Sequence, residues 1–143
     1  MSPNVPSWVE KYIGLEYADH GRGPYRFDCW GLVAHVHWEE HLTYLTDYGD
    51  TYTTSSRDPK VSAAFVAGMN DPVKYRRVEG DEYPAPFDIV VLNIAGRPAH
   101  CGVMLSPTQF LHIHVGTGSC VDAITSPRWS TRVEGIYRVN PRP

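Results

Sequence analysis

Phe27-Asp28-Cys29-Trp30-Gly31-Leu32-Val33 is the stretch from which the fold can be worked out. Asp28 precedes an apolar run, Trp30 to Val36, that carries a single histidine. Asp28 is typical of a helix N-cap, because its carboxylate can accept hydrogen bonds from the free N–H groups of the first turn. Cys29 is then the first helical residue, where the helix dipole favours ionisation of the thiol. The stretch therefore predicts either a nucleophile at a helix N-terminus or a buried structural cysteine, the usual fate of a free thiol.

Length and composition indicate one globular domain over residues 1–143. The chain is 42% hydrophobic and contains 4 Trp and 9 Tyr, which allows a core of its own and excludes a disordered chain. The net charge is −3 without a long basic or acidic run, so neither nucleic acid nor a membrane is expected as a partner. The 3 cysteines have no paired spacing, which argues against a disulfide scaffold.

The N-terminal residues show no apolar signal segment. Residues 1–14 are broken by prolines and carry Glu10 and Lys11, and no stretch of the chain is long enough to span a bilayer. We therefore expect synthesis in the cytoplasm without an export signal.

Helical patterns occupy the first half of the chain. A capping box formed by Ser7 and Glu10 predicts a short first helix over 7–13. The central helix is predicted over 29–42. A third helix is predicted over 59–69, because Asp58 is typical of an N-cap and Pro59 suits the first helical position.

Two segments of the first half lack a helical pattern. Glycines and a proline make 17–26 a predicted loop. The segment 43–56 is polar and aromatic without a period, which predicts a long surface excursion. This excursion is either a lid over a cleft or, through Tyr44, Tyr48 and Tyr52, a protein-binding surface.

After residue 70 the pattern changes to short β-rich segments separated by turns. The predicted strands are 75–78, 88–94, 99–105, 110–115, 119–124 and 133–139, with a helical turn at 127–131 before the last. The strand at 88–94 is largely apolar, so we expect it to be central. Helices followed by an antiparallel meander predict an α+β fold, with helices packed on a central antiparallel sheet of about five to six strands.

A cysteine nucleophile needs a base, and the base needs an orienting partner. His100 and His112 lie on successive predicted strands joined by a tight turn, so their side chains can share one face of the sheet. If the central helix packs against that face, Cys29 meets His100 and His112 orients it. His114 lies two residues from His112 on the same face and competes for the third role. Each histidine alone is more typical of a half-exposed strand position than of a catalyst.

The other cysteines and histidines carry no catalytic pattern. Cys101 follows His100 and projects to the opposite face, which predicts a core residue. Cys120 is interpreted as a small buried or half-buried hydrophobe, and His20 and His35 as surface or satisfied polar groups.

The stretch His37-Trp38-Glu39-Glu40-His41 fits the H-x-x-E-H spacing of a zinc site. Such a site needs a third, acidic ligand from a later helix. The helix predicted at 59–69 is followed by its first acidic residue only at Asp71. The polar end of a helix is therefore the preferred interpretation, and no metal is expected.

Four stretches, in order along the chain, resemble motifs of the NlpC family of papain-like cysteine peptidases. The stretch 27–33 resembles that family's F-D-C-S-G-L-V nucleophile motif, and 86–92 resembles its G-D-I-V-V-F strand. The stretch 99–105 resembles the H-V-G-I-Y-L strand that carries the base. The stretch 110–112 resembles the strand of the third polar residue.

The resemblance implies a papain-like NlpC fold with Cys29, His100, His112 and Tyr17 as the catalytic set. Enzymes of the family hydrolyse bacterial cell-wall stem peptides, typically between D-glutamate and a diamino acid, without a metal or cofactor. Tyr17 stands twelve positions before Cys29, as does the tyrosine of the family's P-Y-x-W-G-G segment. The resemblance assigns its hydroxyl, with the backbone N–H of Cys29, to the oxyanion. Trp30 in place of serine, and the missing W-G-G, depart from the family pattern.

Finer features resemble the tail-associated branch of this family, found in phages, prophages and gene transfer agents. They are Trp30 after the cysteine, the pair Leu111-His112 and the ending Val133-Glu134-Gly135-Ile136-Tyr137-Arg138. This resemblance implies an enzyme carried in a particle's tail that opens the wall locally as the particle injects. Its partners would be peptidoglycan stem peptides and other tail or baseplate proteins. The alternative is a structural tail-assembly protein with a vestigial active site.

Overall fold

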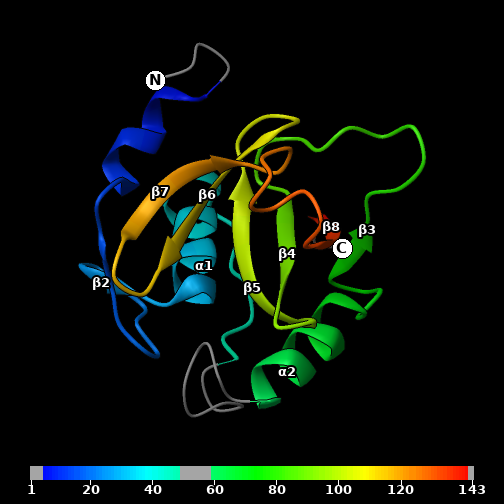
Figure 1. Cartoon of the computed structure of the whole chain (residues 1–143), viewed down its shortest axis with the longest axis horizontal. Helices are drawn as coiled ribbons and strands as arrows, with labels where there is room; N and C mark the ends of the chain where they lie inside the picture. Colours follow the sequence, from blue (N-terminus) through cyan, green and yellow to red (C-terminus); the bar gives the residue numbers. More distant parts are fainter. Residues whose placement is uncertain (1–4, 49–58, 142–143) are drawn as a thin grey trace.

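The computed structural model describes residues 5–48 and 59–141 (Figure 1). The elements of the first half are the 3-10 helix η1 (Ser7–Tyr12), strands β1 (Glu16–Tyr17) and β2 (Arg26–Phe27), and helices α1 (Cys29–His41) and α2 (Pro59–Met69). Six strands follow: β3 (Tyr75–Arg77), β4 (Ile89–Ile94), β5 (Arg97–Met104), β6 (Gln109–His114), β7 (Gly118–Ala123) and β8 (Val133–Val139). The predicted α+β order is therefore confirmed. None of the helices described is long and apolar enough to cross a bilayer.

The six strands form one antiparallel sheet in the order β3-β8-β4-β5-β6-β7. Strands β4 to β7 are a meander, whereas β8 returns to pair with the other edge of β4 and carries β3. The apolar strand β4 lies between β5 and β8, so its predicted central position is confirmed. Both α1 and α2 contact β5, so the predicted packing of helices on a sheet of five to six strands is also confirmed.

The two faces of the sheet belong to separate apolar clusters. On one face α1 packs against β5 and β6, and shares a large core with Cys101, Val103, Leu111 and Ile113. The other face carries a smaller cluster made of Val90, Leu92, Met104, Phe110 and Trp129. Because strand residues alternate between faces, consecutive residues of β5 belong to different environments.

The start of α1 is fixed by the contacts of its N-cap, Asp28. The Asp28 carboxylate accepts a hydrogen bond from the backbone N–H of Gly31 at 2.7 Å, and Arg22 Nη1 pairs with the same carboxylate at 2.7 Å. Asp28 is fully buried, so this ion pair offsets the cost of burying its charge. A Cβ at Gly31 would lie 1.9 Å from the carbonyl oxygen of Gly21, so only glycine lets the preceding loop approach the helix. The predicted cap is confirmed, and Cys29 is the first helical residue.

One local prediction near the N-terminus is wrong. The first helix is a 3-10 helix whose N-cap is Pro6, without a side-chain cap, so Ser7 and Glu10 form no capping box. The expected loop 17–26 is confirmed over 18–25, but at its two ends β1 and β2 pair in parallel, with Tyr17 opposite Phe27. Strands of two residues are too short to leave a periodic pattern in the sequence.

The segment after α1 is held against the start of that helix. Residues 43–48 form neither helix nor strand, and Leu45 among them is buried. The indole Nε1 of Trp30 donates to the carbonyl oxygen of Thr46 at 2.9 Å, so the residue after Cys29 anchors this segment. The rest of the predicted surface excursion and its following N-cap, residues 49–58, lie outside the described residues.

Candidate active site

Cys29 lies at the N-terminal end of α1 with only 6% of its surface exposed. Its thiol shares a hydrogen bond with the thiol of Cys101, the β5 residue that faces α1. Burial and the contact with Cys29 hold the pKa of Cys101 well above its usual range. Cys101 is therefore a neutral core residue, as the sequence predicts, and it gives the candidate nucleophile a polar neighbour.

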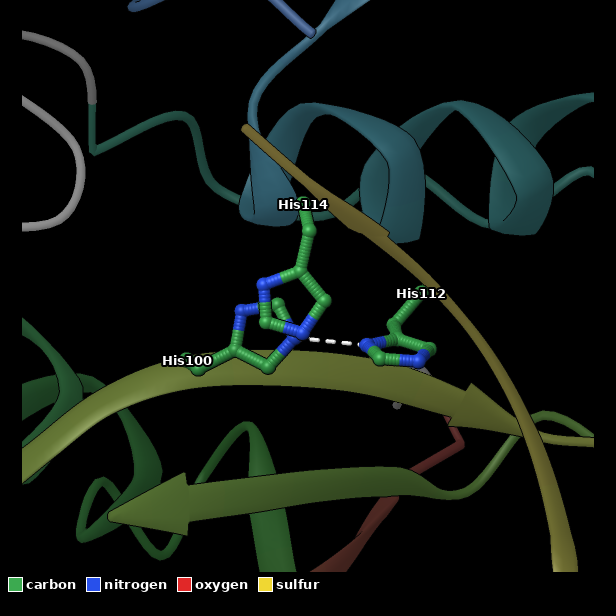
Figure 2. A group of neighbouring side chains, drawn as sticks. All are labelled: His100, His112 and His114. Atoms are coloured by element: carbon green, nitrogen blue, oxygen red, sulfur yellow. Dashed lines mark hydrogen bonds between the residues drawn. The ribbon is translucent and has the colours of Figure 1, made fainter. Parts of the chain in front are cut away.

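A chain of hydrogen bonds joins His100, His112 and Asp122, and we call these three residues the relay. Nε2 of His100 lies 2.8 Å from Nδ1 of His112 (Figure 2), and Nε2 of His112 lies 2.7 Å from Oδ2 of Asp122. Because a carboxylate only accepts hydrogen bonds, His112 carries its proton on Nε2 and accepts on Nδ1. His100 then donates from Nε2, which leaves the lone pair of its Nδ1 to take a proton. The relay thus fixes the tautomer of a base.

Both imidazoles of the relay are buried and held neutral. Burial lowers the pKa of His100 well below its usual range, and the neighbouring His112, His114 and Arg128 lower it further. Burial also lowers the pKa of His112, although the hydrogen bond to Asp122 opposes this. A neutral imidazole near physiological pH is what a general base requires.

His114 stacks on His100 instead of hydrogen-bonding to it. The two ring centroids are 4.4 Å apart and the planes differ by 17°. Trp129 also stacks on His100, with centroids 5.7 Å apart, and its Nε1 donates to Oδ2 of Asp122 at 3.3 Å. The hydrogen bond to His100 favours His112 over His114 as the orienting partner, a choice that the sequence left open.

The backbone pairing between β5 and β6 ends where the histidines begin. In the direction of His100, the pairing stops at Val103 and Leu111. At Gly102 a Cβ would lie 2.7 Å from the carbonyl oxygen of Leu111, so the strands are still in close contact there. Beyond Gly102 the side-chain bond between His100 and His112 joins the two strands in place of the backbone.

The structure differs from the sequence prediction in the face of the sheet that α1 covers. Contact between Cys29 and His100 was expected if α1 packed against the face that bears His100. Instead α1 packs against the face of Cys101, because consecutive strand residues project to opposite sides. Among the described residues, no hydrogen bond joins Cys29 to the relay. The thiol contacts Cys101, and His100, the candidate base, is the residue before Cys101.

Tyr17 lies on β1 beside the segment that leads into α1. It pairs with Phe27, two residues before Cys29. The side chain is half-buried, and its hydroxyl donates to Oδ1 of Asp19 at 3.2 Å. The pairing places Tyr17 near the start of α1, and its role in stabilising an oxyanion stays a prediction.

His37 does not fit the zinc site that its spacing with His41 suggests. Its Nδ1 lies 2.8 Å from the carbonyl oxygen of Val33, and its Nε2 lies 2.8 Å from that of Phe87. Both nitrogens of this buried ring therefore face backbone acceptors, and neither presents a lone pair to a metal. His41 stacks on Phe87 with ring centroids 4.6 Å apart. His37 and His41 therefore contact the backbone and ring of the segment around Phe87, and their spacing does not indicate a metal site.

The environments of Cys120, His20 and His35 agree with the sequence predictions, and Cys120 also contacts the relay. Cys120 is half-buried, and its sulfur lies 3.6 Å from Nε2 of His112, so it touches the relay. His35 is half-buried against the rings of Tyr12 and Phe27, and His20 is exposed.

Sequence reasoning missed Asp122 and Trp129. Within the β6–β7 hairpin, His112 pairs with Cys120, which puts Asp122 on the same face one step along β7. The register of this hairpin, once known, points to Asp122. Trp129 comes from the turn segment before β8, whose fold back over the sheet leaves no periodic signal.

A small apolar pocket lies beside Cys29. It is lined by Cys29 with Trp30, Tyr48, Val61, Phe65 and Met69. The pocket joins the start of α1 to α2, so an apolar group of a ligand would meet the thiol there.

Residues 14–138 match the NlpC/P60 family, a stretch that contains α1 and the whole relay. The chain belongs to the NlpC/P60 family. This places the cysteine at the start of α1 and the histidines of β5 and β6 in one NlpC/P60 domain. No curated protein matches the sequence.

Solved structures share the fold of this NlpC/P60 domain. A Staphylococcus aureus protein described as similar to lipoprotein, NLP/P60 family, has a TM-score of 0.62 at 22% identity over 94% of this chain and 39% of its own. NlpC2 from Trichomonas vaginalis has a TM-score of 0.59 at 19% identity, over 94% of this chain and 44% of its own. The NlpC/p60 domain of the peptidoglycan hydrolase SagA has a TM-score of 0.56 at 19% identity, over 93% of this chain and 92% of its own. The chain thus spans less than half of the first two proteins and nearly all of the SagA domain.

Proposed function

We propose that this NlpC/P60 domain is a cell-wall peptidase in which Cys29 is the nucleophile and His100 the base. The relay carries the proposal, because its hydrogen bonds leave one lone pair on a neutral imidazole. Family membership, and the fold shared with the domain of the peptidoglycan hydrolase SagA, support peptidoglycan as the substrate class.

The reaction is acyl transfer through a thioester. His100 Nδ1 takes the thiol proton, and the Cys29 thiolate attacks the amide carbonyl. The tetrahedral adduct expels the amine, which receives the proton from His100, and leaves an acyl-thioester on Cys29. His100 then takes a proton from water, the hydroxide attacks the thioester, and the acid leaves the Cys29 sulfur. His100 returns the proton to the Cys29 thiolate, which restores the thiol and the neutral imidazole. No redox step or metal enters this sequence.

Proton transfer requires Nδ1 of His100 to come within hydrogen-bond reach of the Cys29 sulfur. Hydrogen bonds of catalytic groups are often long without substrate and shorten in the complex. Two observations support a movement of this kind. Cys29 already contacts Cys101, the residue after His100, and backbone pairing to β6 stops before His100.

The backbone N–H of Cys29 and the hydroxyl of Tyr17 are the proposed oxyanion donors. Cys29 is the first residue of α1, so its N–H has no partner within the helix. The pairing of β1 with β2 supports Tyr17 as the second donor. Loss of one such donor typically costs about 100- to 1,000-fold in rate.

The resemblance described above supports two finer proposals. The bond cleaved is that between D-glutamate and a diamino acid of the stem peptide. The domain acts in the periplasm or cell wall as part of a phage-type tail, with tail or baseplate proteins as partners. The motif details around Trp30, Leu111-His112 and 133–138 support the second proposal.

A structural tail protein with a vestigial site is the second candidate function. The observation that favours it is the state of Cys29, which is 6% exposed and bonded to a thiol instead of an imidazole. In that case the relay would be a buried polar network that stabilises the hairpin.

Mass spectrometry of defined muropeptides, digested by the wild type and by Cys29→Ala, tests the proposal. We expect a single amide cleavage with the wild type and none with Cys29→Ala. Cys101→Ala is the matched control, because it removes the neighbouring thiol and should retain cleavage. Undiminished cleavage by Cys29→Ala would end the cysteine mechanism, and an inactive but folded wild type would favour the structural role.

A further inference from the structure

We propose that His100, His112 and His114 form a binding site for a divalent transition-metal ion of the Zn²⁺ type, and that its occupancy switches the peptidase off. Each residue offers one ring nitrogen, and the three nitrogens lie within 4.8 Å of one another. Figure 2 shows the three rings, from β5 and β6, gathered in one group. Tetrahedral zinc with Zn–N bonds of about 2.0–2.1 Å spaces its ligands about 3.4 Å apart, so the nitrogens must draw together. The stacked rings of His100 and His114, whose planes differ by 17°, must also turn for their lone pairs to meet at one ion.

The nitrogen that points most clearly to a ligand is Nε2 of His114. It is buried and has no hydrogen-bond partner among the described residues. A buried polar nitrogen without a partner lowers the stability of a fold, so it needs an explanation. A metal ion held by the lone pairs of three imidazoles would supply the missing partner.

Asp122 supports the same site from behind. Histidines that bind metals usually donate their other N–H to a carboxylate, which fixes the ring and raises its basicity. The hydrogen bond from His112 Nε2 to Asp122 has this arrangement, and it turns Nδ1 of His112 toward the other two rings. The guanidinium of Arg128 lies 5.0 Å from the centre of the Trp129 ring. Burial lowers the pKa of His114, Arg128 lowers it further, and the Asp122 carboxylate opposes this.

A second donor set, formed by His112, Cys120 and Asp122, overlaps the first. In this set the His112 N–H already donates to Asp122, and the sulfur lies 3.6 Å from that same nitrogen. A metal there would have to displace an existing hydrogen bond. The unpartnered nitrogen of His114 therefore favours the set of three histidines.

Metal binding would disable His100 as a base. In the metal-free relay, His100 carries its proton on Nε2 and accepts on Nδ1. An ion bound at Nε2 moves the proton to Nδ1, and the lone pair that takes the thiol proton disappears. Imidazole ligands, without carboxylates or thiolates, suit zinc, copper or nickel better than magnesium or calcium. The inhibitory part rests on the proposed function, whereas the binding part does not.

Binding can be tested without activity by titrating the metal-stripped full chain with Co²⁺ and following its visible absorption. Competition with Zn²⁺ then gives the zinc affinity. We expect one ion per chain. His114→Phe keeps the stacked ring but removes its nitrogens, and should weaken binding by at least the roughly 10- to 100-fold that loss of a supporting group costs. Cys120→Ser and the exposed-site control His20→Asn should bind as the wild type does.

Three results would overturn the binding site: no uptake of either ion, unchanged affinity in His114→Phe, or loss of binding in Cys120→Ser. His114→Asn is a second variant in case the phenylalanine disturbs folding, which circular dichroism would reveal. Inhibition is tested separately on muropeptide cleavage. Stoichiometric Zn²⁺ should stop the wild type, a chelator should restore it, and His114→Phe should resist zinc in proportion to its weaker binding. Tight binding with unaltered cleavage would overturn the inhibitory part. A chain that is inactive without metal would overturn the proposed function and, with it, the inhibitory part, but not the binding site.

Discussion

The two faces of the sheet around β5 differ in what they hold. The face under α1 carries the large apolar core with the two thiols Cys29 and Cys101, and the opposite face gathers the relay beneath Trp129. A helix cap positions the proposed nucleophile, whereas a β-hairpin and a carboxylate position the proposed base. The difference teaches that the proposed reaction must join groups from opposite faces of one strand, because His100 and Cys101, the residue that Cys29 contacts, are adjacent and face opposite ways.

The strongest test of this comparison removes one partner from each face. Cys29→Ala and His100→Ala should each lower kcat for muropeptide cleavage by roughly 10⁴- to 10⁶-fold, because groups that act as a unit are lost together. The double variant should be no slower than the slower single variant. His20→Ala is the control. Additive losses would mean that thiol and imidazole act separately.

A smaller loss is expected when only the carboxylate of the relay changes. Asp122→Asn keeps the size of the side chain but allows its amide to donate, which lets His112 adopt the other tautomer. We expect kcat to fall by between about 100- and 10,000-fold with little change in KM. The exposed Asp81→Asn serves as the matched control. Wild-type activity in Asp122→Asn would show that Asp122 does not orient the histidines.

The helix side is tested by Gly31→Ala. The added Cβ would lie 1.9 Å from the Gly21 carbonyl, so the loop must move away from the cap. We expect the free energy of unfolding to fall by about 1–3 kcal/mol in urea titrations. Gly68→Ala on α2 is the control, because its Cβ would meet only the end of the Tyr48 side chain. Equal stability of the two variants would contradict the close approach at Gly31.

The smallest effect is the change that His114→Phe makes to the pH dependence of stability. Burial lowers the pKa of His37, His100 and His112, and lowers that of His114 to about 4. The unfolded chain therefore binds protons below pH 6.5 that the folded chain does not, so stability is full above pH 6.5 and falls as the pH drops. Each such histidine contributes a slope of up to about 1.4 kcal/mol per pH unit. Urea titrations between pH 7.5 and 5 check this, and His114→Phe should flatten the slope.

Local signals in the sequence carried most of the fold. The cap at Asp28 and the start of α1 follow from neighbouring residues, so they could be predicted. The pairing of His100 with His112 also follows from local information, because a tight turn between successive strands sets their face. The predicted bounds of the strands from β4 to β8 lie within a few residues of the observed ones, because turns and β-rich segments are local signals.

Contacts between distant segments could not be predicted. The face of the sheet that α1 covers depends on how two apolar surfaces pack into one core, which neighbouring residues do not specify. A shift of one residue along β5 would turn His100 instead of Cys101 toward α1. One backbone acceptor of His37 is the carbonyl oxygen of Phe87, 50 residues away. The sequence does not reveal this contact, so the spacing of His37 and His41 alone could not decide between a zinc site and packing. The position of Asp122 beside His112 depends on the register of the β6–β7 hairpin, which the sequence does not reveal.

The central claim is that His100 on one face of β5 activates Cys29 on the other. The most direct measurement is the rate of iodoacetamide labelling of each cysteine near pH 7, read by peptide mass spectrometry in the wild type and in His100→Ala. The account predicts that Cys29 labels faster than Cys101 and Cys120, and that His100→Ala slows it by at least about tenfold. A Cys29 that labels no faster than Cys101, at the same rate with and without His100, would contradict it.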